Sequence, residues 1–255
     1  MKITFLGTGT SQGVPIIGCN CNACLSKDDK DKRLRCAIMV TLDDGKNIVI
    51  DTGPDFRQQM LREKVQDVEA VLITHEHNDH IIGIDDVRPI NFKHRKDMPV
   101  YAVERVIQNL RERFKYVFAP NPYPGIPRLN LLPMHKSQPF EIAGQRIIPI
   151  EVMHYKLPVI GFRFNDFTYL TDIKTISDEE LEKVKGTKIL VLGALQRQQH
   201  ISHLTIDEAI ELAQKINPEM TYLTHLSHRL GKHHDVIKTL PKNITLAYDG
   251  LQLHI

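Results

Sequence analysis

The sequence predicts an α+β fold in which two mixed β-sheets pack face to face and helices cover their outer sides, an αββα sandwich. Short apolar runs that are typical of strands recur along the whole chain of 255 residues. Helical patterns are fewer and lie among these runs, without the regular strand and helix alternation of a parallel α/β protein. We see neither a linker nor an internal repeat, so we expect a single domain over residues 1–255.

Strands are expected where short runs of apolar and β-branched residues are bounded by turn residues. Asn165 and Asp166 lie between two such runs and predict the two-residue turn of a tight hairpin. The expected strands are residues 2–6, 37–42, 47–50, 70–73, 100–102, 146–152, 160–164, 167–170, 188–192, 221–223 and 245–247.

The clearest helix covers residues 205–216. Thr205 and Glu208 form a capping box at its start, and the pair Asn217-Pro218 ends it. Further helices are expected over residues 56–64, 104–114 and 178–184. Residues 114–133 hold five prolines and predict an irregular segment, which is either an ordered surface loop or a lid beside the substrate.

Composition excludes several classes of protein. The 33 basic and 31 acidic residues nearly balance, which argues against a general nucleic-acid binder. No apolar stretch is long enough to cross a membrane, and the first residues lack the pattern of a secretory signal, so we expect a cytoplasmic protein. The 13 histidines direct attention to metal binding or acid–base chemistry.

The strongest chemical feature is the segment Thr-His-Glu-His-Asn-Asp-His, which follows the expected strand at residues 70–73. In an extended segment, side chains two residues apart point the same way, so His75 and His77 can share one metal ion. A turn after them would bring Asp79 and His80 toward a second ion. The spacing differs from the helical H-E-x-x-H zinc motif, in which the two histidines are four residues apart.

This H-x-H-x-D-H motif after a strand resembles the metallo-β-lactamase superfamily, which has the αββα fold. Matching residues follow at later strand ends, and Asp51 matches the family's buried structural aspartate. The ligands that the resemblance implies for one metal are His75, His77 and His154. Those implied for the second are Asp79, His80 and His225, with Asp172 bridging the two ions.

Two divalent ions about 3.5–4 Å apart can polarise a phosphoryl or carbonyl oxygen and supply hydroxide at neutral pH, so hydrolysis is the expected chemistry. Histidine and carboxylate ligands suit Zn²⁺ and also Mn²⁺, so the sequence leaves the metal open.

A second group of candidate ligands lies near the N-terminus, where Cys19, Cys21 and Cys24 form a C-x-C-x-x-C pattern. Reduced thiols in a cytoplasmic protein favour metal binding over disulfides, and a tetrahedral zinc needs a fourth ligand. His228 follows His225 by three residues. Cys36 has no place in this group and is expected to be a small buried residue.

The chain resembles the phosphoribosyl cyclic phosphodiesterase family of bacterial phosphonate breakdown in three motifs. These motifs are G-T-G-x-x-Q-G-V-P, then G-C-x-C-x-x-C, and a late T-H-x-S-H. The resemblance covers nearly the whole chain. It implies that Cys19, Cys21, Cys24 and His228 hold one structural Zn²⁺, besides the two divalent ions of the active site. The start, Gly7-Thr8-Gly9, departs from the dinucleotide-binding fingerprint and predicts a close-approach turn near the metals.

The same resemblance implies hydrolysis of a small cyclic phosphate, such as a phosphoribosyl 1,2-cyclic phosphate. His203 corresponds to a histidine that acts as general acid on the leaving oxygen, and His200 is its rival for that role. We therefore expect His203 and the metal ligand Asp79 to be the catalytic residues. Lys156 is two residues past His154 and could contact a substrate phosphate.

Three other interpretations stay open. One is a nuclease that processes transfer-RNA 3′ ends, which would carry an extra RNA-binding arm. Another is a cofactor-biosynthesis protein of the same fold with redox chemistry, and the third is a metal-stabilised module without catalysis. The expected partner is a small phosphodiester substrate, with neither a membrane nor a nucleic acid. The sheet edges and the proline-rich segment would allow a homodimer.

Overall fold

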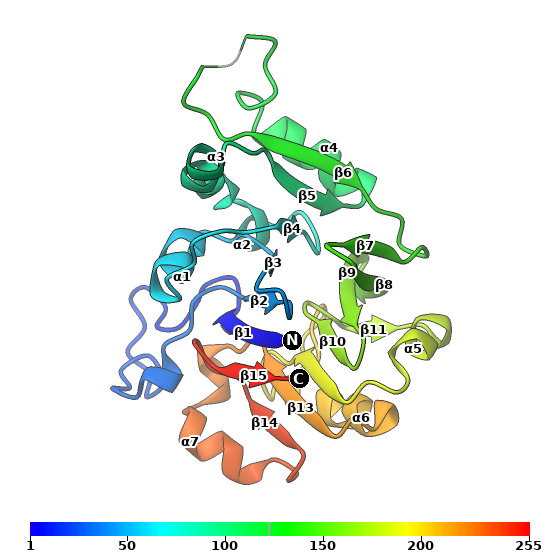
Figure 1. Cartoon of the computed structure of the whole chain (residues 1–255). Coiled ribbons are helices and arrows are strands. Elements are labelled where there is room, and N and C mark those ends of the chain that lie inside the picture. Colours follow the sequence, from blue (N-terminus) through cyan, green and yellow to red (C-terminus); the bar gives the residue numbers. More distant parts are fainter. Residues whose placement is uncertain (122) are drawn as a thin grey trace.

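The computed structural model describes residues 1–121 and 123–255 and contains two mixed β-sheets (Figure 1). The first sheet has the strand order β15-β1-β2-β3-β4-β5-β6. Its pairs are antiparallel from β15 to β3 and parallel from β3 to β6. These strands are β1 (Lys2–Gly7), β2 (Ala37–Thr41), β3 (Asn47–Ile50), β4 (Ala70–Leu72), β5 (Met98–Ala102), β6 (Leu129–Pro133) and β15 (Gln252–His254).

The second sheet has the order β11-β8-β9-β10-β12-β13-β14, and β7 also pairs with β8. The strands from β8 to β10 are antiparallel, whereas those from β10 to β14 are parallel. These strands are β7 (Phe140–Ile142), β8 (Gln145–His154), β9 (Leu157–Phe164), β10 (Phe167–Leu170), β11 (Thr175–Ile176), β12 (Ile189–Gly193), β13 (Met220–Thr224) and β14 (Ile244–Leu246).

Helices cover the outer face of each sheet, with α1, α3 and α4 on one side of the molecule and α5 and α6 on the other (Figure 1). Side chains that alternate along the strands pack against these helices, while the opposite set forms the core between the sheets. The helices are α1 (Phe56–Arg62), α2 (Asn78–Ile81), α3 (Arg88–His94), α4 (Glu104–Arg113), α5 (Asp178–Val184), α6 (Ile206–Ile216) and α7 (His233–Val236). The fold is thus the predicted αββα sandwich.

Local signals in the sequence predicted most elements well. Every expected strand is present within a few residues of its predicted bounds, and the Asn165 turn adopts the left-handed conformation with φ 51°. The capping box of α6 is formed, since the Thr205 hydroxyl accepts from the Glu208 N–H and the Glu208 carboxylate accepts from the Thr205 N–H. Asn217 ends the helix with φ 56°.

The prediction of an irregular segment over residues 114–133 was wrong at its C-terminal end. Residues 129–133 form β6, which pairs in parallel with β5 at the edge of the first sheet. Pro133 ends the strand at this edge, where no further strand requires its missing N–H. Pairing with β5, rather than an alternating pattern of its own, makes this segment a strand.

The loop after β1 lies beside the last loops of the chain. Gly9 forms bridges with Arg35 and with Leu226, and a Cβ at Gly7 would lie only 1.9 Å from the Arg35 carbonyl oxygen. The glycines therefore allow close backbone approach, as predicted, and they bring residues 10–12 next to the segment that follows β13.

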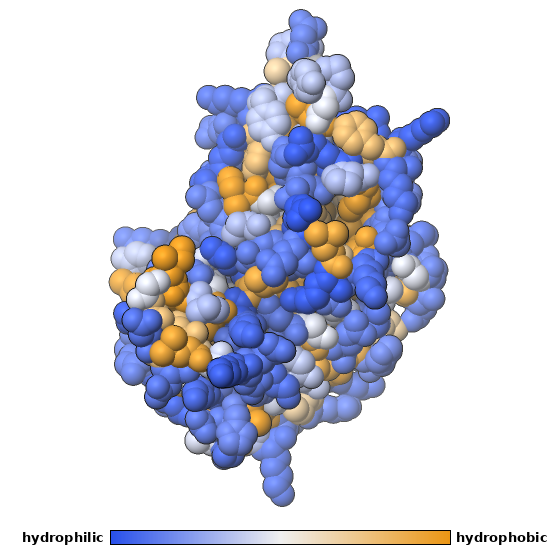
Figure 2. Space-filling view, turned by 90° about the vertical axis from the view of Figure 1, so that its left-hand side faces the viewer, coloured by the Kyte–Doolittle hydropathy of each residue, from blue (hydrophilic) through white to orange (hydrophobic). Residues whose placement is uncertain are grey.

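In the part of the chain that the structure describes, no helix has the length and apolarity that crossing a membrane requires. Apolar residues on the face in Figure 2 form separate groups among hydrophilic ones rather than one continuous patch.

Candidate metal centre and active site

The chemistry-bearing residues meet where strands of both sheets end. The histidine motif follows β4, His154 is the last residue of β8, Asp172 follows β10, and His225 follows β13. Three residues at these ends have left-handed backbones, with φ of 69° at Asp51, 49° at Asp172 and 59° at His225. Such strain in non-glycine residues persists where the surrounding structure holds it, and it is concentrated at functional sites.

His75 and His77 face one another from an extended backbone. His75 Nε2 lies 3.0 Å from His77 Nδ1, so both nitrogens point to a common position, as their spacing predicted. The ring of His154 lies 5.4 Å from that of His77. Because His154 Nδ1 donates to the Ser202 carbonyl oxygen over 2.8 Å, its Nε2 is left as the ligand nitrogen.

Asp79, His80 and His225 form an adjoining group whose candidate ligand atoms all lie within 4.8 Å of one another. Asp172 reaches both histidines of this group, with Oδ2 at 3.3 Å from His80 Nε2 and Oδ1 at 3.2 Å from His225 Nε2. Asp172 also joins His75 and His80 in one group of candidate ligands. Its carboxylate therefore lies close to candidate ligands predicted for each of the two ions.

Asp51 contacts the histidine motif at His80 and at Thr74. Its Oδ2 is 2.7 Å from His80 Nδ1, and its Oδ1 accepts from the Thr74 N–H at 2.9 Å. The Thr74 hydroxyl contacts both Asp51 and His75 Nδ1. Asp51 is fully buried, as predicted, and its carboxylate keeps the His80 proton on Nδ1 so that Nε2 can bind a metal.

The buried, unpartnered nitrogens of this site fit metal ions. His80 Nε2 and both ring nitrogens of His225 are buried without a hydrogen-bond partner among the described residues. Leaving such a group unpaired costs ~1–3 kcal/mol, and a bound cation would satisfy each nitrogen that faces Asp172. The set of imidazoles and carboxylates is the donor set that Zn²⁺ or Mn²⁺ accepts.

Burial and the neighbouring charges favour the protonation states that bind metals, an ionised carboxylate and a neutral imidazole, at most of these residues. Burial raises the pKa of Asp172, but His225, His80, His75 and His203 together hold it well below its usual value. Burial lowers the pKa of His75 well below its usual value. Burial also lowers the pKa of His80, but the nearby carboxylates outweigh this effect and raise it well above the usual value. Without a cation, His80 therefore carries the positive charge that a metal would replace.

His203 packs against the candidate metal ligands, whereas His200 lies farther from them, on the other side of His203. The His203 ring is 4.4 Å from that of His154 and 4.7 Å from that of His225, and its Nδ1 is 3.9 Å from Asp172 Oδ1. The His200 ring is 5.1 Å from His203. Burial, aided by the neighbouring histidines, lowers the pKa of His203 to about 2, so its ring is neutral in the free protein.

The predicted cysteine group is assembled with His228. His228 Nδ1 lies 3.3 Å from Cys19 Sγ, 3.4 Å from Cys21 Sγ and 3.6 Å from Cys24 Sγ. A tetrahedral zinc with usual bond lengths holds its nitrogen and sulfur ligands about 3.6 Å apart, so the four atoms fit one ion. The Cys24 N–H lowers the pKa of Cys21 to about 6, whereas burial raises the pKa of Cys24 to about 11.

Cys36 is buried, as predicted, and contacts the hydroxyls of Tyr169 and Thr224 rather than the cysteine cluster.

Two cavities lie beside the candidate ligands, one lined by His154 and the other by His203. The first, of about 420 Å³, is bounded by His77, His154 and the largely apolar side chains Tyr155, Leu157 and Ile201. The second, of about 250 Å³, is polar and is bounded by His200 and His203 and by residues 10–12, 195–196 and 227–229. The candidate site is therefore bordered by one largely apolar cavity and one polar cavity.

The family described as a β-lactamase superfamily domain matches residues 46–226, which include the histidine motif and all the strand ends above. The chain belongs to the metallo-β-lactamase superfamily. The candidate metal ligands therefore lie on the fold of this superfamily.

The proteins and solved structures that resemble this chain carry names that indicate different activities. A solved structure described as a new diphosphatase from the PhnP family is 40% identical, covers 100% of this chain and 97% of that one, and has a TM-score of 0.92. An octanoyltransferase of Porphyromonas gingivalis is 42% identical over 99% of this chain and 51% of that protein. Zn²⁺-bound PqqB of Methylobacterium extorquens has a TM-score of 0.82 at 16% identity over 100% of both chains, which shows the fold alone. The chain spans about half the length of the curated relatives it matches first.

Apart from Asp51, the groups that orient the ligands were not predicted from the sequence. The Ser202 carbonyl that orients His154 belongs to the backbone and leaves no trace in a sequence pattern. Glu76, between the first two histidines, pairs with Arg105 of α4, which also donates to the Pro158 carbonyl at 2.7 Å. A threonine directly before the first histidine and a glutamate between the two histidines were the available signals.

Proposed function

We propose that the protein hydrolyses a small cyclic phosphodiester, such as a phosphoribosyl 1,2-cyclic phosphate. The observation that carries this proposal is the position of His203, whose ring packs against His154 and His225 and lies close to Asp172. A thiolate leaves a thioester without a proton donor, whereas an alkoxide leaving a phosphoryl group needs one.

Two divalent ions are proposed to occupy the centre, each with its own set of ligands. One set is His75, His77 and His154, the other is Asp79, His80 and His225, and Asp172 is shared. Bound there, such ions polarise a phosphoryl oxygen and lower the pKa of water. A third ion, Zn²⁺, is proposed to bind Cys19, Cys21, Cys24 and His228, where four fitting donors meet away from the reacting centre.

The side chains supply orientation and the proton. Asp51 and the Ser202 carbonyl fix the rings of His80 and His154, so that the ligand nitrogens need no reorganisation when substrate binds. His203 is neutral in the free protein. A phosphoryl anion beside the ring favours the imidazolium form, because an opposite charge raises the pKa of histidine. The charged ring then protonates the departing alkoxide as the P–O bond breaks.

The relatives' names support this activity more than the alternatives. The PhnP-family structure, described as a diphosphatase, matches the chain from end to end. The octanoyltransferase is about twice as long as the matched region, so the activity in its name can belong to the half that has no counterpart here. Between Asp172 and His225 the chain forms β11, α5, β12, α6 and β13, which leaves little room for the RNA-binding arm of a transfer-RNA nuclease.

The test is a substrate panel with metal-reconstituted protein: ribose cyclic phosphates, linear phosphodiesters, RNA and octanoyl thioesters. We expect the highest kcat/KM on a ribose 1,2-cyclic phosphate. Asp172→Ala, prepared in parallel, should lose this activity and so exclude a contaminating enzyme. Faster hydrolysis of RNA or of a thioester by the wild-type protein, lost in the same variant, would replace the proposal with that activity.

A further inference from the structure

The three histidines of the first predicted metal position come from two different sheets. His75 and His77 follow β4 of the first sheet, whereas His154 ends β8 of the second. Their nitrogens can meet at one ion only while the two segments keep a fixed separation, because metal affinity depends on ligands that are already in place. A contact that joins the two sheets at this point would therefore act on the first position.

Arg105 makes a contact of this kind. It is the second residue of α4, the helix that follows β5 of the first sheet. Its guanidinium pairs with the Glu76 carboxylate, and its Nη2 donates to the Pro158 carbonyl oxygen over 2.7 Å. Pro158 of β9 is paired with Met153, the residue next to His154. One side chain thus joins the residue between two candidate ligands to the strand beside the third.

Glu76 is placed for this role by the extended backbone of the histidine segment. Successive side chains of such a backbone point to opposite sides, so Glu76 points away from the position that His75 and His77 face. Its side chain is 15% exposed, and its Oε2 is buried without a hydrogen-bond partner among the described residues. A carboxylate with so little exposure requires a compensating cation, which Arg105 supplies.

A second arginine of α4 contacts the same motif but does not reach the other sheet. Arg113, the last residue of the helix, donates to the Asn78 side-chain oxygen, and this contact is exposed to solvent. It holds the motif within the first sheet only. Arg113 therefore separates a contact that holds the motif from one that joins the motif to the strand beside His154.

We propose that Arg105 is a positioning residue that fixes the His75–His77 segment relative to His154 and so sets the metal affinity of the first position. The inference rests on the metal centre of the proposed function. A guanidinium suits the task because its planar group presents several donors in fixed directions, which lets one side chain hold a carboxylate and a carbonyl together.

The experiment is calorimetric titration of Mn²⁺ into the metal-depleted protein, in which the binding step that His154→Ala removes identifies the first position. Arg105→Gln should weaken this step by about 10–100-fold, the usual effect of a residue that orients metal ligands, and should leave the other step unchanged. The Arg105 side chain is 38% exposed, so the variant should remain folded. Arg105→Lys, whose compact ammonium keeps the charge but does not span both acceptors, should recover part of the affinity.

Arg113→Gln is the matched control, because it removes the same charge from the same helix and should leave both binding steps unchanged. Wild-type affinity at the first position in Arg105→Gln would overturn the proposal. Equal weakening of both steps in that variant, or the same weakening in Arg113→Gln, would also overturn it.

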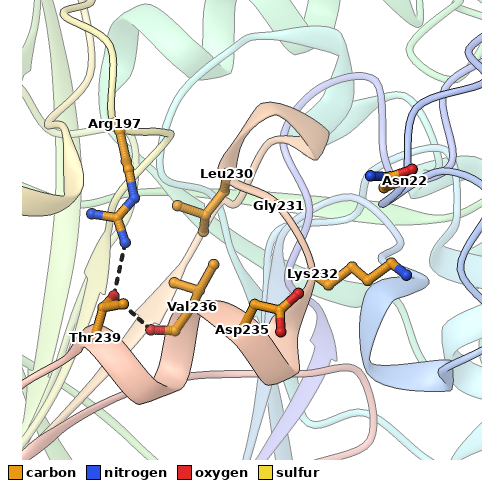
Figure 3. A pocket seen from close by; sticks show the side chains of 8 residues that line it. All are labelled: Asn22, Arg197, Leu230, Gly231, Lys232, Asp235, Val236 and Thr239. Atoms are coloured by element: carbon orange, nitrogen blue, oxygen red, sulfur yellow. Dashed lines mark hydrogen bonds between the residues drawn. The ribbon is translucent and has the colours of Figure 1, made fainter.

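Added guanidinium distinguishes a positioning role from a general loss of stability. Arg105 and Pro158 line a cavity of about 340 Å³, so guanidinium ions can enter the space that Arg105→Ala opens. They should restore affinity at the first position at concentrations far below those that unfold proteins, whereas sodium chloride should not. Arg197 also lines a cavity, of about 370 Å³, and donates to the Thr239 hydroxyl over 2.8 Å (Figure 3). Arg197→Ala should match the wild type with and without guanidinium, and a rescue of both variants or of neither would refute the role.

The titrations need no substrate, so they separate this role from the proposed function. If the wild type hydrolyses no cyclic phosphate but Arg105→Gln weakens the first step, the proposed function fails and the positioning role stands. If the wild type hydrolyses a cyclic phosphate and Arg105→Gln keeps both steps, only the positioning role fails. A wild type from which His154→Ala removes no step would refute the first ligand set and the role of Arg105 together.

Discussion

Replacing Asp51 by asparagine should weaken metal binding without touching a metal ligand. The carboxylate accepts from His80 Nδ1 at 2.7 Å and from Thr74 at 2.9 Å, and it is fully buried. Asparagine has nearly the same shape but only one acceptor oxygen. If its amide donates to His80 Nδ1, the imidazole proton moves to Nε2, the nitrogen that faces Asp172 and Asp79.

Two magnitudes follow from these contacts. A lost hydrogen bond to a charged group costs about 1.5–3 kcal/mol, which sets the expected fall in the free energy of unfolding of the metal-free protein. The wrong tautomer of His80 removes a ligand lone pair, and changes in residues that orient ligands reduce metal affinity about 10–100-fold. The affinity of the Asp79, His80 and His225 group should fall by this factor.

The assay is calorimetric titration of Mn²⁺ into metal-depleted Asp51→Asn, together with urea unfolding in the presence of chelator. Asp249→Asn is the matched control, because Asp249 is also an aspartate with little exposure that accepts from a threonine hydroxyl, at 2.7 Å, and from a backbone N–H, at 2.8 Å. It lies outside the candidate ligands and should leave Mn²⁺ affinity unchanged. Wild-type affinity in Asp51→Asn, or an equal loss in Asp249→Asn, would refute the reasoning.

Three further predictions concern the cysteine cluster, the general acid and a buried carboxyl. Cys21→Ser should lose the one Zn²⁺ that survives mild chelation of the wild type. Its free energy of unfolding should fall on the order of 4 kcal/mol, as for a lost metal. Elemental analysis and thermal unfolding check this, and the control variant Cys36→Ser should keep the zinc. His203→Ala should slow hydrolysis of a sugar cyclic phosphate by ~10²–10⁴-fold yet barely affect a p-nitrophenyl diester, whose leaving group needs no proton. With both metals retained, equal slowing of the two substrates, or the same contrast in His200→Ala, would remove the role from His203. Burial raises the pKa of Asp249 to about 6 from its usual 3.8, so the folded state favours the protonated form. Relative to Asp249→Asn, the wild type should therefore lose about 2 kcal/mol of unfolding free energy as pH rises from about 4 to 7. Parallel pH profiles of the two proteins would contradict this.

Much of the fold and of the ligand chemistry could be predicted from local patterns. Short apolar runs predicted the strands, and the capping box with Asn217 predicted the bounds of α6, because these signals act over a few residues. The two-residue spacing of His75 and His77 predicted that their nitrogens face one position, and the structure has them 3.0 Å apart. The roles of these residues as ligands remain predictions that the metal titrations test.

Contacts between distant segments were decided by the tertiary structure alone. Residues 129–133 are a strand only because β5 offers its edge, and Asp172 lies between His80 and His225 only because parallel pairing aligns the ends of β10, β12 and β13. His228 reaches cysteines about 200 positions earlier in the chain. The register of the sheets determines these meetings, and register depends on pairing partners that no local window contains. The sequence by itself therefore determined which elements and which donor types this protein has, and the packing of the two sheets decided which of them meet.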